Sequence, residues 1–354
     1  MKKVFYFSPY LLPSTKAAGV RSHYFIQSLK ECYSIHAVSE KELWFKLPTN
    51  HDGTLKRLML EILCGVSLFF KVIFSRAEIY VFSSPPFFTV FLGAMGCIFF
   101  KKKYVLDIRD IYPDVFVLAG LIREKSFPHQ VLLAMASLLY RRAKLIVTVT
   151  QGLVEKIEAR GGQKRTKLIY NGFDEDLFYP TASKFDHFTL VSHGTLGKFQ
   201  NIELIVELAQ KLLVADPEIR ILIIGAGPKA QLLENAPKNL KFLGELPFED
   251  LGFYVRRSHI GLSLRKNDVI SIESFPVKLF EYLGSGLHCF VAPKGEASKY
   301  VVESGRGELI GDDADLIVKS ILQQKRKYQL HQPLKKFTRQ EQGKFFANLI
   351  KAIK

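Results

Sequence analysis

The sequence predicts an α/β protein with two doubly wound parallel sheets. Short apolar strands alternate with helical patterns along the chain, which is typical of parallel strands joined by helical crossovers. The order of strand, glycine-bearing loop and helix starts at Val4 and starts again at His187. The length of 354 residues also exceeds what one ordinary core needs, and 48% of the residues are hydrophobic, enough to bury two sheets.

The first half is predicted to open with a strand at Val4, a loop that ends at Gly19, and a helix. Further strands are expected at 34–39, 79–82, 104–108, 145–150 and 168–170, and helices at 20–29, 53–75, 87–100, 127–142 and 151–160. The helices at 53–75 and 87–100 are apolar nearly all round, with cations near their ends. Such helices suit either burial under a sheet or contact with an anionic membrane surface.

A turn-rich connection at 171–180 indicates a domain boundary near residue 175. The second half then repeats the pattern. Its strands are expected at 187–193, 220–224, 241–243, 260–264 and 288–292, and its helices at 202–213, 313–325 and 337–353, with another helix after Pro276. No sequence repeat is visible beyond this shared rhythm.

Composition narrows the possible partners. The net charge is +16, and residues 1–175 carry 25 Lys and Arg against 14 Asp and Glu. This excess favours phosphate-bearing partners such as nucleic acid, anionic lipid or a pyrophosphate substrate, although it also serves solubility. We expect no nucleic acid, because the basic residues are dispersed and no aromatic-basic motif interleaves them. No apolar run reaches 18 residues, the first apolar run is too short for a signal peptide, and the four cysteines show no paired spacing. We therefore expect a cytoplasmic protein with free thiols and no metal site.

The stretch from Glu273 to Glu281 is the most informative in the chain. Ser274 can cap a helix and Pro276 fits its first turn, which would place Glu273 just before the helix and Glu281 inside it. The free amides of such a helix start attract anions. Two carboxylates beside an anion site suit a ligand with hydroxyls and phosphate, such as a nucleotide sugar; the alternative is a surface helix with two incidental glutamates.

Four motifs, by their order along the chain, resemble the retaining family-4 (group 1) glycosyltransferases. In chain order they are 169–174 (Ile-Tyr-Asn-Gly-Phe-Asp), 193–197 (His-Gly-Thr-Leu-Gly), 224–228 (Ile-Gly-Ala-Gly-Pro), and Glu273 to Glu281 with the following Tyr-Leu-Gly-Ser-Gly. The resemblance covers about 165–310. It implies the GT-B fold, with two Rossmann-like domains that face a central cleft. The expected domains are 1–175 for the acceptor and 176–335 for the nucleotide sugar, with 336–354 packing back on the first domain.

The resemblance also implies roles for individual residues. Glu281 would accept hydrogen bonds from the ribose hydroxyls, and Glu273 would orient the donor sugar and favour positive charge at the anomeric carbon. The diphosphate would be held by cations and by backbone amides at a helix start. The residues expected around it are Gly19, Arg21, Gly194, Lys198, Arg265, Phe275, Pro276, Val277 and Lys278. The family's usual Arg and Lys align with Thr195 and Gln200, so Lys198 is the nearest basic substitute.

Charged residues also follow the strand at 104–108, at the end where open parallel sheets bind ligands. They are Asp107, Arg109, Asp110 and Asp114. Many family members have a His-Asp pair here, and this chain has Arg109-Asp110. We expect Arg109 to act as a fixed cation and Asp110 to contact the acceptor hydroxyl, with a role as base. A structural Arg–Asp ion pair is the competing interpretation.

The resulting expectation is a glycosyltransferase that needs neither metal nor cofactor and uses a nucleoside-diphosphate sugar, with UDP as the expected carrier. The hexosyl or N-acetylhexosaminyl group would go to a saccharide or polyprenyl-diphosphate-linked acceptor, at the inner face of the cytoplasmic membrane. The chain resembles bacterial enzymes of capsule, O-antigen or exopolysaccharide assembly. Alternatives are a catalytically silent binding partner with the same fold, a nucleic-acid binder, and a non-hydrolysing sugar-nucleotide epimerase.

Overall fold

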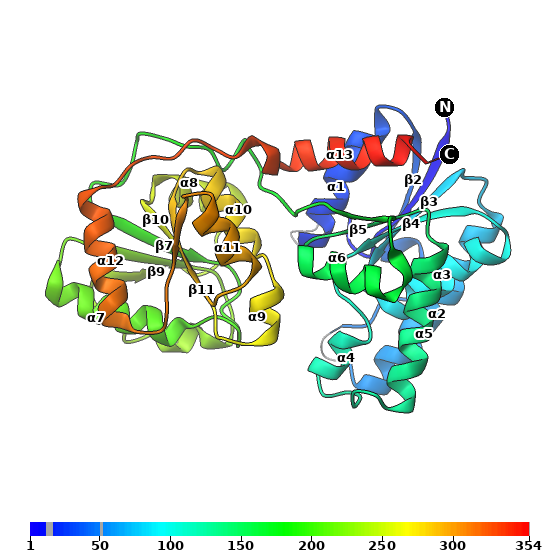
Figure 1. Cartoon of the computed structure of the whole chain (residues 1–354), viewed down its shortest axis with the longest axis horizontal. Helices are drawn as coiled ribbons and strands as arrows, with labels where there is room; N and C mark the ends of the chain where they lie inside the picture. The colour runs from blue at the N-terminus through cyan, green and yellow to red at the C-terminus, as the bar shows by residue number, and fades with distance from the viewer. Residues whose placement is uncertain (12–16, 50–51, 354) are drawn as a thin grey trace. The chain divides into compact units, whose positions relative to one another are not determined.

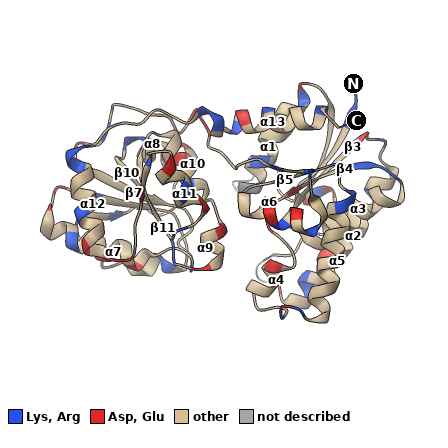
Figure 2. Ribbon diagram, in the orientation of Figure 1, with Lys and Arg blue, Asp and Glu red and all other residues tan. Residues whose placement is uncertain are grey.

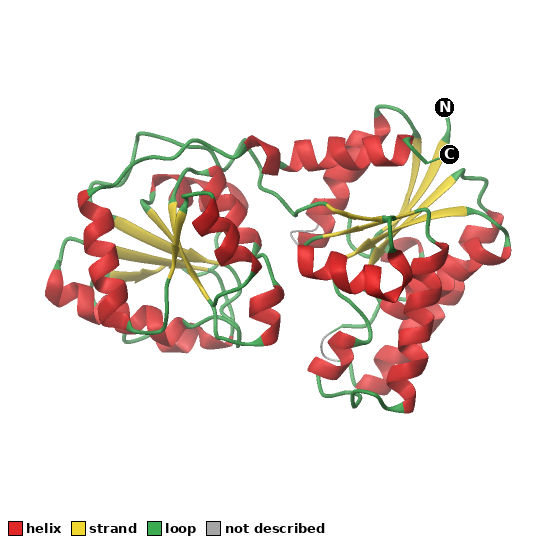
Figure 3. Cartoon of the chain, viewed as in Figure 1, coloured by secondary structure: helices red, strands yellow, loops and turns green. Residues whose placement is uncertain are grey.

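The computed structural model describes residues 1–11, 17–49 and 52–353, and in this part of the chain it contains two six-stranded parallel sheets covered by helices (Figures 1 and 3). The chain divides into two compact units. The first comprises Met1–Asn171 and Gln340–Lys354, and the second comprises Gly172–Arg339. The predicted α/β class with two doubly wound sheets is confirmed. The assignment of these units to acceptor and donor stays a prediction.

The sheet of the first unit has the strand order β2-β1-β3-β4-β5-β6. Its strands are β1 (Lys3–Phe7), β2 (Ser34–Val38), β3 (Ile79–Ser84), β4 (Lys103–Ile108), β5 (Leu145–Thr148) and β6 (Thr166–Leu168). Every residue of β3 is buried, as expected for a central parallel strand with both faces covered. Successive side chains alternate between two cores, with Phe5 and Phe7 in one and Val4 and Tyr6 in the other.

The helices of the first unit are α1 (Ala17–Lys30), α2 (Thr54–Phe74), α3 (Phe87–Phe99), α4 (Asp114–Leu118), α5 (Phe127–Arg142), α6 (Gln151–Ile157) and α13 (Arg339–Lys351), with short helical turns η1 (Glu40–Glu42) and η2 (Glu158–Gly162). α2 and α3 pack closely because glycines face the partner helix. A Cβ added at Gly93 would lie 2.7 Å from Leu68 Cδ2, and one at Gly65 would lie 2.7 Å from Leu92 Cδ1.

The two apolar helices differ in how much they bury. α3 lies largely within the core, whereas α2 buries Cys64, Leu68 and Val72 and leaves a row of apolar side chains exposed. That row comprises Leu55, Met59, Ile62, Val66, Phe70 and Phe74. No helix among the described residues combines the length and hydropathy that a bilayer crossing needs. The burial prediction therefore holds for α3 and for one face of α2, and contact of the exposed α2 row with an anionic membrane surface stays a prediction.

The sheet of the second unit has the order β12-β11-β10-β7-β8-β9. Its strands are β7 (Thr189–His193), β8 (Arg220–Ile224), β9 (Leu240–Phe242), β10 (Ile260–Leu264), β11 (His288–Ala292) and β12 (Gly307–Leu309). Its helices are α7 (Ile202–Ala215), α8 (Phe248–Arg257), α9 (Val269–Glu273), α10 (Val277–Gly284), α11 (Glu296–Glu303) and α12 (Ala314–Arg326), with η3 (Pro228–Leu233) and η4 (Lys335–Phe337). Lys and Arg positions are spread over helices and loops of both units (Figure 2).

The terminal helix α13 returns to the first unit, as expected. Phe346 and Ile350 are fully buried there, and the Phe346 ring stacks on Phe25 of α1 with 4.1 Å between the centroids. The chain enters and leaves the second unit along adjacent segments. Phe173 N donates to Phe337 O at 2.9 Å, and Arg339 N donates to Phe173 O at 2.8 Å.

Several elements differ from the prediction. β6 covers 166–168 instead of 168–170, and the short helices α4, α8, α9 and α11 were not expected. Helices of five to ten residues show too few turns for a periodic apolar pattern to be recognised. Their boundaries depend on caps that tertiary packing selects, as at Asp268, whose Oδ1 accepts from Ser271 N at 2.9 Å at the start of α9.

Candidate functional site

Two short helices carry the acidic stretch. Glu273 is the last residue of α9, and Glu281 lies one turn inside α10. The expectation that Ser274 caps the following helix is wrong: Ser274 ends α9, its Oγ donates to Ser271 O at 3.0 Å, and it accepts a hydrogen bond from Arg265. The residue before α10 is Pro276, which makes no side-chain cap. The first amides of α10 are therefore open to a ligand.

Glu281 is the centre of a buried charged cluster in the second unit. The residue is 3% exposed, its Oε2 lies 3.1 Å from His193 Nε2, and its Oε1 lies 3.5 Å from Arg339 Nη2. Burial raises the pKa of Glu281, but hydrogen bonding and charge from His193, with the charges of Arg339 and Lys278, outweigh burial and leave the pKa below its usual value. Glu281 is therefore an ionised carboxylate held in a fixed position.

Lys278 is the most unusual cation in this unit. It lies on the first turn of α10 and is 7% exposed, and its Nζ donates to Gln200 Oε1 at 3.1 Å. Burial, together with the charge of Arg265, lowers the pKa of Lys278 to about 7, although the charge of Glu281 opposes both. No carboxylate lies within ion-pair distance of its ammonium among the described residues. An anion placed here would supply the missing partner.

Two glycine-bearing loops meet beside Lys278. Gly194 follows β7 with φ +109, and Gly225 follows β8 with φ +138. A Cβ at Gly225 would lie 2.0 Å from Gly194 O, so only glycine fits, and Leu196 N donates to Ala226 O at 2.8 Å. A Cβ at Gly194 would meet only Lys278 Cε, at 3.8 Å. The surface above Gly194 is thus open, with Lys278 at its edge.

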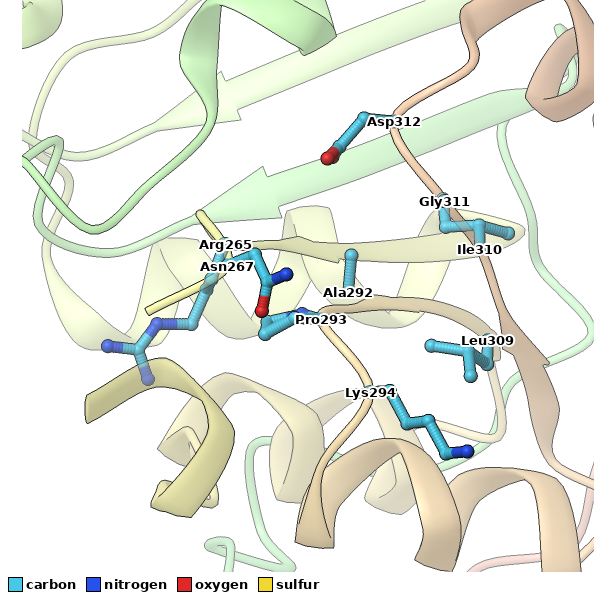
Figure 4. A pocket seen from close by; sticks show the side chains of 9 residues that line it. All are labelled: Arg265, Asn267, Ala292, Pro293, Lys294, Leu309, Ile310, Gly311 and Asp312. Atoms are coloured by element: carbon cyan, nitrogen blue, oxygen red, sulfur yellow. The ribbon is translucent and has the colours of Figure 1, made fainter. Parts of the chain in front are cut away.

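Arg265 lies at the carboxyl end of β10 and lines a pocket of about 400 Å³. The other lining residues are Asn267, Ala292, Pro293, Lys294, Leu309, Ile310, Gly311 and Asp312. Figure 4 shows the guanidinium turned away from the hollow, toward a neighbouring helix. Burial lowers the pKa of Arg265, and Asp268 opposes this. Because β10, β11 and β12 all end here, the pocket occupies the usual ligand edge of a parallel sheet.

The remaining donor candidates have different environments. Lys198 is exposed, with its Nζ 4.9 Å from the centre of the Phe199 ring. Glu273 is half-buried. Phe275 packs into the core against Phe280, with ring centroids 4.3 Å apart, so only its backbone can face a ligand. Pro276 has no N–H, and the open amides of this helix start are those of Val277 and Lys278.

Arg109 and Asp110 follow β4 in the first unit. Arg109 Nε is buried and has no hydrogen-bond partner within the described ranges, and no ion pair joins it to Asp110. Part of Asp110 is exposed at the surface, yet neighbouring protein atoms partly desolvate its carboxyl group and so raise its pKa. The charge of Arg109 opposes this effect. The competing interpretation as a structural Arg–Asp ion pair is not seen. Asp114 does pair, at 2.7 Å from Arg160 Nη2.

Arg21 is held by protein contacts, and its expected contact with phosphate stays a prediction. Its Nε lies 3.1 Å from Asp107 Oδ1, and its Nη1 donates to Ile169 O and Tyr170 O, both at 2.9 Å. This buried network ties α1 to the sheet, while Arg21 Nη2 is buried and has no hydrogen-bond partner among the described residues. Gly19 lies in the first turn of α1 and is buried; the loop at 12–16 before it lies outside the described residues.

Sequence reasoning assigned no role to His193, Gln200 or Arg339, although all three contact predicted site residues. His193 is signalled by its place at the end of β7, directly before Gly194. Arg339 lies 58 residues from Glu281, and no local pattern connects them. Within the described residues, no group of three or more His, Cys, Asp or Glu is arranged to hold a metal ion.

Residues 173–341 match the family model described as glycosyl transferases group 1. A curated relative, the probable glycosyltransferase WbjE of Pseudomonas aeruginosa, is 22% identical over 58% of this chain and 55% of its own length, so the match spans about half of that relative. Among solved structures, Anabaena HepE in complex with UDP-glucose has a TM-score of 0.64 at 15% identity, with 99% of this chain and 97% of that chain covered. The lipopolysaccharide outer core galactosyltransferase WaaB has a TM-score of 0.66 at 14% identity, with 99% of both chains covered. These structures share the GT-B fold.

Proposed function

Through its C-terminal half this chain belongs to the group 1 glycosyltransferases, and from that premise we propose that it is a retaining enzyme that moves a sugar from UDP to an acceptor hydroxyl. A nucleoside-diphosphate sugar is the donor class of the family. The choice of UDP is supported by HepE, which was solved with UDP and UDP-glucose, and the sugar itself is a hexose or N-acetylhexosamine.

The observation that carries the proposal is the buried ammonium of Lys278 at the open start of α10. Burial and the charge of Arg265 lower its pKa to about 7, and no carboxylate pairs with it within the described part of the chain. A diphosphate would accept hydrogen bonds from Lys278 and from the amides of Val277 and Lys278, above the open face of Gly194. Such fixed donors stabilise the negative charge that develops on the leaving diphosphate.

The two glutamates would act on either side of that diphosphate. Glu281, ionised and held by His193 and Arg339, would accept hydrogen bonds from the ribose. Glu273 would hold hydroxyls of the transferred sugar and favour positive charge at its anomeric carbon. One oxygen of Glu281 already lies 3.1 Å from His193. We therefore infer that the ribose hydroxyls donate to the lone pairs of this carboxylate that His193 leaves available.

On the acceptor side we propose that Asp110 orients the acceptor hydroxyl and takes its proton. Its raised pKa suits a general base, and Arg109 supplies a fixed positive charge beside it. The acceptor we propose is a lipid-linked saccharide of bacterial surface polysaccharide assembly, at the inner face of the cytoplasmic membrane. The basic charge of residues 1–175 and the exposed apolar row of α2 support contact with such a substrate.

The test combines binding and turnover. Thermal shifts against a panel of nucleotide sugars identify the donor, since a ligand at 100 times its Kd stabilises the fold by about 2.7 kcal/mol. The rate of acceptor-free hydrolysis of that donor is then measured for the native chain and for Glu273→Ala. We expect the variant to hydrolyse the donor at least tenfold more slowly and to keep the melting temperature of the native chain. No hydrolysis by the native chain, and no effect of the substitution, would instead identify a silent binding partner. Conversion of the sugar to its epimer would identify an epimerase.

A further inference from the structure

The first unit contains a second, larger pocket that the proposed chemistry does not use. Its volume is about 640 Å³, and it lies between α2, α4 and α5, which Figure 1 shows gathered at one end of this unit. Most of its lining is apolar, including Leu58, Phe88, Val115, Phe116, Leu132 and Met135. A hollow of this size and character suits an apolar ligand.

One polar group at the rim is a cation. The Arg57 side chain is exposed and has no ion pair or hydrogen bond with a described residue, whereas its neighbour Lys56 pairs with Asp52 at 2.7 Å. Glu61, deeper in the wall, accepts a hydrogen bond from Phe88 N at 3.2 Å. Burial raises the pKa of Glu61, which the Phe88 amide and Arg57 oppose. An anionic group would therefore sit at the rim beside Arg57 and away from Glu61.

The pocket adjoins the candidate acceptor residues. Tyr112 lines it and follows Asp110 by two positions on the turn after β4. Burial raises the pKa of Tyr112; the charges of Asp110 and Glu61 raise it further, and those of Arg57 and Arg109 oppose them. Arg57, Asp110 and the hollow are thus neighbours within the first unit.

The mouth of the pocket opens onto apolar surface. Val131 is 42% exposed and Leu121 is 50% exposed, and both line the hollow. Leu58 also lines it and belongs to α2, whose exposed row begins beside it. A chain too long for the hollow could continue along this row, which would keep one side of the chain out of water.

We propose that this pocket binds the first part of the apolar chain of a lipid-phosphate acceptor, with Arg57 on the phosphate and the acceptor hydroxyl directed toward Asp110. The proposal rests on the proposed function, because it assumes that the acceptor is lipid-linked. A single apolar chain fits better than a helix of a protein partner, since the site is a hollow with one rim cation and not a flat face. Isoprenoid and straight alkyl chains share the required chemistry.

The experiment measures binding of four probes to the full chain by isothermal titration, below the concentration at which each aggregates. Farnesyl phosphate has both groups, farnesol lacks the phosphate, isopentenyl phosphate has a minimal chain, and dodecyl phosphate has a straight chain. We expect farnesyl phosphate to bind at least tenfold more tightly than farnesol or isopentenyl phosphate. Its affinity relative to dodecyl phosphate then distinguishes an isoprenoid from an acyl source.

Two variants localise the binding. Val131→Trp fills the mouth from an exposed position and should weaken farnesyl phosphate at least tenfold. Arg57→Glu should weaken it by a similar factor and leave farnesol unchanged. Arg76→Glu, at an exposed site beyond the far end of α2, and Val214→Trp, at an 87% exposed position of α7 outside the pocket lining, are the matched controls and should bind as the native chain does. Equal affinity in Val131→Trp and the native chain would overturn the proposal.

A second measurement tests the proposed function independently of the pocket. Stabilisation by UDP and acceptor-free hydrolysis of the donor should be unchanged in Val131→Trp and Arg57→Glu. Donor hydrolysis without any farnesyl phosphate binding would reject the pocket assignment and leave the transferase assignment intact. Concentration-dependent dimerisation that Val131→Trp abolishes, measured by sedimentation, would show that a second copy covers this face and would also overturn the proposal.

Discussion

At the scale of single residues, the charge of Lys278 should lower the stability of the fold and strengthen the binding of UDP. Its ammonium is buried beside Arg265, and its pKa is about 7 against a usual value of 10.5. At pH values below 7 the residue is charged in both the folded and unfolded states, so the cost of burying the charge is fully present. Between pH 7 and 10.5 only the unfolded state stays protonated, so the free energy of unfolding should rise with pH across this window.

We expect Lys278→Met to raise the free energy of unfolding by on the order of 2–4 kcal/mol below pH 7, since each unit of pKa depression corresponds to about 1.4 kcal/mol. The same change should weaken UDP at least tenfold because a charge-assisted hydrogen bond is lost. In the native chain the UDP affinity should fall from pH 7 to pH 9 as Lys278 deprotonates, and this slope should disappear in the variant. Urea unfolding and calorimetric titration at several pH values measure both effects.

Lys198→Met is the matched control on the neighbouring loop. Because Lys198 is exposed, its loss should leave stability unchanged within about 0.5 kcal/mol. A tenfold loss of UDP affinity in Lys198→Met, with none in Lys278→Met, would move the phosphate contact to the loop and contradict the assignment.

At the scale of elements, the closest helix pair depends on glycine. Gly93 of α3 faces Leu68 of α2, and an added Cβ would lie 2.7 Å from Leu68 Cδ2 and 3.2 Å from Phe82 Cε1. Replacing a helical glycine usually stabilises a helix, so tertiary packing here reverses the sign. We expect Gly93→Val to lower the free energy of unfolding by about 1–3 kcal/mol through overpacking.

Gly152 in α6 provides the comparison, because a Cβ there would meet no atom within 4 Å. Gly152→Val should change the free energy of unfolding by no more than about 0.5 kcal/mol. Chemical denaturation of both variants decides the question. Equal effects at the two positions would mean that backbone entropy, and not the contact between α2 and α3, explains why Gly93 is glycine.

At the scale of the whole molecule, the last helix belongs to the unit in which the chain began. Phe346 of α13 is fully buried against Phe25, whereas its neighbour Phe345 is 44% exposed. Phe346→Ala should therefore lower the free energy of unfolding of the first unit by about 3–5 kcal/mol. Phe345→Ala should change it by no more than about 0.5 kcal/mol.

Donor binding separates the two units in this experiment. Since the proposed UDP contacts lie in Gly172–Arg339, calorimetric scans should show the UDP-dependent stabilisation retained in Phe346→Ala. Loss of UDP binding together with the first unit's stability would show that the second unit does not hold the donor by itself.

Much of the architecture could be predicted because it depends on local pattern. The buried strands β1, β3, β8 and β10 are short apolar runs, and α5 begins and ends where its periodicity does. The two-sheet class followed from the repeated order of strand, loop and helix. The motif around Glu273 and Glu281 also identified the family on which the functional proposal depends.

The tertiary structure decided which charged groups are available and which are already paired. Asp107 and Arg21 are as polar in the sequence as Asp110 and Arg109, yet the first pair is buried in mutual contact and the second is not. Nothing local indicates that Arg339 lies 3.5 Å from Glu281, or that Lys278 is buried. Secondary structure follows from contacts between near neighbours in sequence, whereas the pKa and accessibility of a side chain depend on distant segments that only the folded chain brings together.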